Sequence, residues 1–366
     1  MIRGSWLRRQ IRWVLWTAIA GMLILPGRAM TGWQDVKGGG ATLKVYFVDV
    51  EGGQATLFVT PARRSLLIDT GWPGNEYRDA NRIAAAVKKA GLRKIDYVLI
   101  THYHDDHVGG FTQLLEKVPV GAVIDHGPNR ELDKGDVEHN YDAYEKAIAA
   151  KKIKRMTAHP GDVLPIIGMK ATVVSADGDL IKNALAGGGE ANQFCKDSET
   201  RPADQTENSR SVGVQIVFGK LKLLDLGDLT WDKEMELMCP SNRVGTVDVL
   251  IVSHHGWYQS SSPALVDAIG ARVAIMDNGA KKGGSTPTME TISKAPGLEA
   301  LWQLHYSEEG GEEHNTAKEY IANPQGVDGN YLELIGSGDG SFDVMNSYTK
   351  ETKHYVAAKS TAVAAQ

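Results

Sequence analysis

The sequence predicts an α/β fold in which two groups of strands are each interrupted by helices. Apolar runs rich in β-branched residues recur along the chain, and segments with helical spacing separate them. A dense group of histidines and aspartates directly follows one of these runs. The chain has 366 residues, of which 42% are hydrophobic, so it can bury one large core or two modest ones. We expect one elaborated domain at residues 41–346, because no Pro/Ser-rich linker or repeat divides the middle.

Strand patterns open this domain at residues 43–49, 55–60 and 65–69. Helical spacing follows at 79–90, where Ile83, Val87 and Ala90 fall on one face. The next apolar run, 95–100, predicts a strand that leads into the histidine-rich loop. Two helices are expected after it, at 109–115 and 142–152.

The second half of the domain repeats this alternation. Strand patterns occur at 171–175, 211–218, 221–226 and 248–252. A helix at 264–270 precedes a strand at 272–277, and short strands close the domain at 331–335 and 341–345. Residues 178–205, which include Gly187-Gly188-Gly189, predict a mobile insertion placed where it could act as a lid. Residues 347–366 are expected to form a C-terminal tail.

The histidine-rich loop, 101–110, contains His102, His104, Asp105, Asp106 and His107. Three imidazoles and two carboxylates within six positions indicate a metal site, because these ligands suit zinc and similar divalent ions. A polar loop at a strand end is the alternative. Alternate residues of an extended segment share a face, so the first two histidines can point at one ion. Asp106 and His107 are then available for a second ion, whereas Asp105 is expected beside the ligands or in solvent.

The pattern His-x-His-x-Asp-His at 102–107 resembles the signature of the metallo-β-lactamase superfamily, and further segments match in order. Residues 66–71 end in Asp-Thr-Gly, and the resemblance implies that Asp69 supports the metal loop from behind. Residues 223–228 resemble the strand whose aspartate, here Asp228, bridges two metals. Residues 247–256 resemble the strand that delivers the last histidine ligand, His254 or His255.

The His-His-Gly ending narrows the resemblance to one branch of the superfamily. That branch includes the hydrolase domain attached to the DNA-uptake channel ComEC, and bacterial phosphorylcholine esterases look related to it. The resemblance implies an αββα sandwich with its site at one edge. It also implies a metal-dependent hydrolase that uses a metal-bound hydroxide, which Asp106 would orient, most plausibly on a phosphodiester. We favour His254 slightly as the ligand, which leaves His255 at the cleft rim or as a proton donor to the leaving group.

The chain departs from the superfamily at the third histidine of the first metal site. The candidates for this position are His126, His139 and His159, but the resemblance places Asn208 there instead. An asparagine is a poor zinc ligand. We therefore expect one or two zinc ions, with manganese as a substitute, and place Asn208 beside the substrate cleft.

The first residues resemble an export signal. Four arginines precede the apolar segment 13–25, and small residues follow it, so residues 1–29 predict a signal peptide and a periplasmic or secreted protein. A retained membrane anchor is the alternative, and no later segment is apolar enough to span a bilayer. The two cysteines, Cys195 and Cys239, could form a disulfide in that compartment or stay as thiols.

The net charge of the chain indicates which class of substrate it favours. Removal of residues 1–29 leaves 35 basic against 45 acidic residues, which favours a small-molecule ester over nucleic acid as the substrate. Residues 281–284, Lys-Lys-Gly-Gly, could contact a phosphate, but we assign them to a solvent turn. Within the enzyme class a β-lactam or lactone hydrolase is the alternative. A noncatalytic binding protein on the same fold is disfavoured because the expected ligands are all retained.

Overall fold

The computed structural model describes residues 40–132 and 135–358. The expected signal peptide, residues 1–29, lies outside the described residues. Over the two described ranges, no helix combines the length and apolar character needed to cross a membrane.

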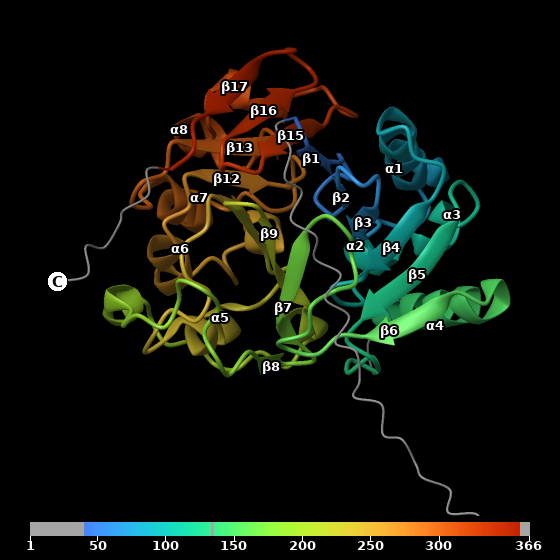
Figure 1. Ribbon diagram of the computed structural model, residues 1–366, viewed down its shortest axis with the longest axis horizontal. Coiled ribbons are helices and arrows are strands. Elements are labelled where there is room, and N and C mark those ends of the chain that lie inside the picture. The colour runs from blue at the N-terminus through green and yellow to red at the C-terminus, as the bar shows by residue number, and fades with distance from the viewer. Residues whose placement is uncertain (1–39, 133–134, 359–366) are drawn as a thin grey trace, which may run out of the picture. The chain divides into compact units, whose positions relative to one another are not determined.

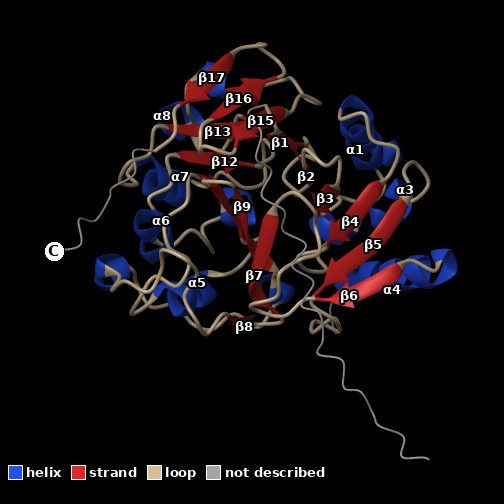
Figure 2. Ribbon diagram, in the orientation of Figure 1, coloured by secondary structure: helices blue, strands red, loops and turns tan. Residues whose placement is uncertain are grey.

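The described strands form two mixed sheets (Figures 1 and 2). The first sheet has the order β17 (Thr352–Tyr355), β16 (Phe342–Asn346), β15 (Leu332–Ser337), β1 (Thr42–Phe47), β2 (Thr56–Val59), β3 (Ser65–Ile68), β4 (Ile95–Leu99), β5 (Val120–Asp125) and β6 (Lys154–Thr157). The second sheet has the order β14 (Ile321–Asn323), β13 (Ala300–His305), β12 (Val273–Met276), β11 (Val249–Ile251), β10 (Leu221–Asp225), β9 (Gly213–Phe218), β7 (Lys170–Ala176) and β8 (Asp179–Leu180).

Helices cover the outer face of each sheet. Those near the first sheet are α1 (Arg78–Lys89), α2 (Asp105–Val108), α3 (Phe111–Leu114) and α4 (Gly135–Lys151), seen on the right in Figure 1. Those near the second are α5 (Trp231–Met238), α6 (Pro263–Ile269), α7 (Thr286–Ser293) and α8 (Gly311–His314). Short 3-10 turns are η1 (Asn75–Tyr77), η2 (Gln193–Asp197), η3 (Glu207–Arg210), η4 (Ser253–Gly256) and η5 (Lys318–Tyr320). The expected αββα sandwich is confirmed.

The alternation of side chains along the central strands explains the layers. Leu66 and Ile68 of β3 join the core between the sheets, whereas Leu67 joins the core beneath α1, α3 and α4. In β11, Val249 and Ile251 likewise face the other sheet, and Leu250 packs under α5 to α7. Successive strand residues point to opposite faces, so strands buried on both sides are apolar throughout.

Two boundaries differ from the expectation. Helix α4 begins at Gly135 rather than 142, because its first turns are mostly polar and bury Val137 and Asn140 among exposed residues. The expected tail contributes β17, which pairs antiparallel with β16. Tyr355 of β17 is buried, stacks on Phe342 with ring centroids 4.8 Å apart, and accepts a hydrogen bond of 2.9 Å from Trp302 Nε1. The sheet therefore extends into the segment assigned to a tail.

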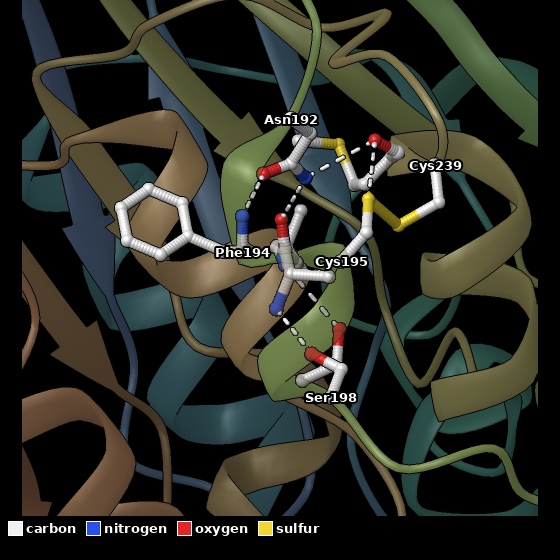
Figure 3. The surroundings of a disulfide bond; sticks show 9 residues. Asn192, Phe194, Cys195, Ser198 and Cys239 are labelled. Atoms are coloured by element: carbon white, nitrogen blue, oxygen red, sulfur yellow. Dashed lines mark hydrogen bonds between the residues drawn. A yellow bond between two sulfur atoms is a disulfide. The ribbon is translucent and has the colours of Figure 1, made fainter.

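The segment 178–205 is fastened to the outside of the second sheet. A disulfide joins Cys195 in η2 to Cys239 after α5, with their Cα atoms 5.8 Å apart (Figure 3). Beside it, Asn192 Nδ2 donates to the carbonyl of Met238 at 3.1 Å and to that of Ala264 at 2.8 Å. This segment is thus held at its centre. Of the two alternatives that the sequence allowed for the cysteines, the disulfide is the one observed.

Removing this disulfide tests how much the tether contributes to stability. The bridge closes a loop across a sequence separation of 44 residues, so Cys195→Ala combined with Cys239→Ala is expected to lower the free energy of unfolding by about 2–4 kcal/mol. Chemical denaturation of the double variant and of the native chain, each with and without reductant, measures the difference. A double variant as stable as the oxidised chain would contradict the tether.

Candidate metal centre

Strand ends from both sheets bring the site together. Strands β3 and β4 run parallel in the first sheet, and β10, β11 and β12 run parallel in the second. Parallel strands present their carboxyl ends at the same edge, where polar side chains can gather. Asp69 follows β3, the histidine-rich loop follows β4, Asp228 follows β10, and His254-His255 follow β11.

Backbone hydrogen bonds join these loops, both between the two sheets and within the second sheet. The amide of Val212 donates to the carbonyl of Thr101 at 2.9 Å, and the amide of His254 donates to the carbonyl of Gly227 at 3.0 Å. Gly227 has a φ of +56°, and a Cβ there would lie 2.8 Å from the Cβ of Thr101. Glycine is therefore required where the Asp228 loop meets the histidine loop.

Four ligand atoms converge at this edge. Those of Asp106, His107, Asp228 and His255 all lie within 4.8 Å of one another, and all four residues are buried. His107 Nε2 is 3.2 Å from Asp228 Oδ2, 3.3 Å from Asp106 Oδ2 and 3.1 Å from His255 Nε2. The structure thus gathers residues that are up to 149 positions apart in the sequence, between 106 and 255.

The remaining predicted histidines approach Asp228 as well. His102 Nε2 lies 3.1 Å from His104 Nδ1 and 3.9 Å from Asp228 Oδ2. His254 Nε2 lies 3.4 Å from the same oxygen. Asp228 is therefore the carboxylate that both sets of histidines approach.

The structure brings both His254 and His255 to the site. Neighbours on a strand would face opposite ways, but both residues lie in the turn η4 with positive φ values of 56° and 54°. Both rings consequently reach Asp228, and His255 is the one whose Nε2 joins Asp106 and His107. His254 faces Asp228 from the side of His102.

Carboxylates behind the histidines decide which ring nitrogen faces the site. His107 Nδ1 lies 2.7 Å from Asp69 Oδ2, and a carboxylate only accepts, so Nδ1 carries a proton and Nε2 is the nitrogen that faces the site. Asp69 also accepts from the Thr101 hydroxyl at 2.6 Å, and that hydroxyl lies 3.1 Å from His102 Nδ1. One buried aspartate thus holds the His107 ring directly and the His102 ring through the Thr101 hydroxyl.

Two further carboxylates of this kind were missed in the sequence. Glu131 Oε2 lies 3.1 Å from His104 Nε2, which leaves His104 Nδ1 facing the site. Asp277, at the end of β12, lies 3.4 Å from His255 Nδ1. Both Asp277 oxygens are buried and lack a hydrogen-bond partner among the described residues. Neither residue belongs to a local motif, so strand order alone could have pointed to Asp277.

The electrostatics suit a bound cation. Burial alone would raise the pKa of Asp228, but His107, His254 and His255 hold that pKa well below its usual range. The pKa of Asp106 is likewise low despite burial, because Lys282 and His107 stand beside it. Burial lowers the pKa of His254 to about 4, so its ring is neutral at pH 7. Despite burial, Asp228 and neighbouring carboxylates raise the pKa of His107 and of His255 well above the usual range, so these rings carry the positive charge that a metal ion would replace. Carboxylates and imidazoles together are a donor set that fits zinc or manganese.

Other predicted residues take different places. Asn208 lies at the site, with its Nδ2 3.5 Å from His254 Nε2 and its buried Oδ1 unpartnered within the described ranges. Asp105 turns away and accepts a hydrogen bond from Asn140. Of the candidate third histidines, His126 is buried against Glu207 at 2.9 Å, whereas His139 and His159 are exposed. These three therefore lie elsewhere than in the cluster.

The lysine-containing loop of residues 281–284 is not a solvent turn. Lys282 Nζ contacts Asp106 Oδ2 directly and lies 4.6 Å from the centroid of the Trp72 ring. Its side chain is 34% exposed, whereas that of Asp106 is 6% exposed. The assignment of this loop to solvent is therefore wrong at Lys282, because the chain folds back between residues 277 and 285 toward the histidine cluster.

A second group with metal-ligand chemistry is already neutralised by the protein. Asp49, Glu51 and His305 lie together, with His305 Nε2 2.7 Å from Asp49 Oδ1. Arg82 Nη1 occupies both carboxylates, at 2.9 Å from Asp49 and 3.1 Å from Glu51. Arg82 thus engages two of the three potential ligands here, whereas Lys282 contacts one of the four in the cluster around Asp228, so that cluster is the candidate metal centre.

Comparisons with known proteins agree with this geometry. Residues 48–178 match the family model of the metallo-beta-lactamase superfamily, a range that contains Asp69 and the histidine-rich loop but ends before Asp228. Competence protein ComA of Neisseria gonorrhoeae is 25% identical over 248 residues, which are 67% of this chain and 29% of that protein. ComE operon protein 3 of Bacillus subtilis is 23% identical over 255 residues, which are 64% of this chain and 28% of that protein.

Solved structures resemble the chain more loosely. The metallo-beta-lactamase fold protein YhfI from Bacillus subtilis is 13% identical with a TM-score of 0.42, over 71% of this chain and 95% of YhfI. The two curated relatives are much longer than the matched region, which spans less than a third of each.

Replacing Asp277, the carboxylate behind His255, gives a test that measures zinc affinity and does not depend on substrate turnover. Asp277→Asn keeps the shape of the side chain but removes the charge that holds the His255 ring, so the affinity for zinc is expected to fall by about 10- to 100-fold. Competition with a chromophoric chelator measures this affinity. Asp248→Asn is the matched control, since Asp248 is a partly desolvated carboxylate at the opposite end of β11. Equal zinc affinity in the two variants would contradict a role for Asp277.

Proposed function

This chain carries a metallo-β-lactamase superfamily domain, and from this premise we propose that it is a metal-dependent hydrolase of phosphodiesters. The observation that carries the proposal is the convergence of Asp106, His107, Asp228 and His255 at one buried edge. The first ion would be held by these four residues. A second would share Asp228 with His102, His104 and His254: Nε2 of His102 and of His254 approach Asp228 Oδ2, and His104 lies beside His102.

The residues of the site have separable tasks. Divalent cations held there would polarise the substrate oxygen and acidify a water molecule near neutral pH. Asp69 accepts a hydrogen bond from His107 Nδ1, and Asp277 lies 3.4 Å from His255 Nδ1, so the Nε2 atoms of both rings face the site. Asp106 would also accept a hydrogen bond from the attacking water and orient it. Burial of these groups excludes bulk water, which strengthens each electrostatic contact.

A small phosphodiester fits the chain better than a long nucleic acid. The relatives of the competence type support the branch of the superfamily to which the sequence was likened. The net charge of −5 gives the chain no excess of basic residues with which to neutralise a run of backbone phosphates. A compact ester such as a phosphocholine ester requires only the buried cluster and its rim.

The proposed location is outside the cytoplasm, in the periplasm or in the medium. Residues 1–29 carry the pattern of an export signal, and a retained leader would instead anchor the chain to the membrane. The disulfide between Cys195 and Cys239 supports export, because such bonds persist in oxidising compartments.

A panel of substrates tests the reaction class. We expect the purified chain, loaded with zinc or manganese, to hydrolyse bis(4-nitrophenyl) phosphate faster than nitrocefin or a simple lactone. Asp106→Ala removes one carboxylate of the cluster, so kcat/KM is expected to fall about 100-fold or more. Asp142→Ala, an exposed carboxylate on α4, is the matched control and should retain full activity.

The panel separates the alternatives. Turnover of nitrocefin or a lactone without phosphodiester turnover would replace the proposal with the corresponding hydrolase. A chain that binds metal but cleaves no substrate of the panel would favour the noncatalytic binding protein. Unchanged activity and metal content in Asp106→Ala would refute the ligand assignment itself.

A further inference from the structure

We propose that Lys282 forms an anion-binding subsite beside the metal centre, which holds a negatively charged oxygen of the substrate. This inference rests on the proposed function and names the feature of the substrate that the site selects. The chemical class is a phosphodiester monoanion, whose non-bridging oxygens carry the charge. A neutral ester lacks that charge and would gain nothing from the lysine.

The position of Lys282 is the first observation. Its ammonium contacts Asp106 Oδ2, the same oxygen that lies 3.0 Å from His255 Nε2 and 3.3 Å from His107 Nε2. Its methylene stem reaches this point from the rim, and the side chain remains 34% exposed. Lys282 is therefore a cation that touches the cluster and is also accessible from solvent.

The turn that carries Lys282 is fixed against the site. The amide of Gly279 donates to the carbonyl of Lys282 at 2.8 Å, and the amide of Gly284 donates to that of His255 at 2.9 Å. Gly283 has a φ of +77°, and a Cβ there would lie 2.1 Å from the oxygen of His255. Glycine is thus required at 283 so that the lysine turn can pack directly on the histidine turn.

The Lys282 ammonium has more N–H donors than its contact with Asp106 uses. A lysine offers three N–H groups, and among the described residues Asp106 Oδ2 is the acceptor that Lys282 reaches. The Trp72 ring, 4.6 Å away, attracts the charge without accepting a conventional hydrogen bond. Two N–H groups therefore remain for an incoming anion, directly beside the oxygen that would help to hold a cation.

This arrangement places opposite charges where an anionic ester needs them. An oxygen bound to Lys282 would lie next to the cluster around Asp106, so the phosphorus would be drawn toward the attacking water. Lys281, the neighbouring residue, is exposed and lies in the same turn. The pair Lys281 and Lys282 thus provides a comparison between two lysines of equal charge at different depths.

The experiment compares Lys282→Met with Lys281→Met in the full chain loaded with zinc. For the anionic bis(4-nitrophenyl) phosphate we expect Lys282→Met to raise KM by about 10- to 100-fold, since one charge-assisted hydrogen bond is lost. The inhibition constant of inorganic phosphate should rise by a similar factor. The loss on the neutral diethyl 4-nitrophenyl phosphate should be smaller than the loss on the anionic ester, because Lys282 acts on the neutral ester only through its contact with Asp106. Zinc should still be bound, and Lys281→Met should match the native chain.

Several results would overturn the subsite. These are an equal loss on both esters, a loss of zinc from Lys282→Met, or an unchanged KM and phosphate inhibition. Calorimetric titration of the zinc-loaded chain with inorganic phosphate distinguishes failure of the subsite from failure of the proposed function. If no phosphodiester is cleaved but phosphate binds the native chain and binds Lys282→Met at least 10-fold more weakly, the subsite stands and the reaction does not.

Discussion

The site depends on one interaction, the burial of the Asp228 carboxylate among the imidazoles of His107, His254 and His255. Taking a carboxylate out of water is costly unless positive charge or hydrogen bonds replace its hydration. Asp228 is 2% exposed, and its Oδ1 has no hydrogen-bond partner among the described residues. A divalent cation supplies the missing compensation, and the surrounding elements are arranged so that it can.

Separate parts of the fold bring the ligands to one edge, allow the two sheets to meet there and orient the histidine rings. Parallel strands in both sheets deliver ligands to one edge, and Gly227 allows the two edges to meet closely. Asp69 accepts a hydrogen bond from His107 Nδ1, and Asp277 lies 3.4 Å from His255 Nδ1, so the Nε2 atoms of both rings face the site. The large core between the sheets provides rigidity, which a metal centre needs because ligand positions must be fixed to within fractions of an ångström.

The sequence revealed the parts of the site that are local. The residues of the histidine-rich loop are contiguous in the sequence, so their metal-binding chemistry could be recognised without the structure. The apolar runs on either side predicted the strands that position the loop. Asp69, Asp228 and the His254-His255 pair were found by resemblance, because each sits in a short motif at a strand end. The strand order and the pairing of β17 depend on contacts between distant segments, which no local pattern reports.

The missed residues share a physical reason. Glu131, Asp277 and Lys282 act through contacts with residues far away in the chain, and their neighbours in sequence look like ordinary loop or strand ends. The preference for His254 over His255 rested on strand alternation, which does not apply to two residues that lie in a turn with positive φ. Backbone conformation at such a turn is set by tertiary packing, here by the close approach of Gly283.

The most direct test of the central claim is the anomalous diffraction of the zinc-loaded protein at the zinc absorption edge. The account predicts a peak bounded by Asp106, His107, Asp228 and His255, and the peak should vanish in Asp228→Asn crystals while the fold is retained. A peak at Asp49, Glu51 and His305 instead, or no peak near Asp228 at saturating zinc, would contradict it.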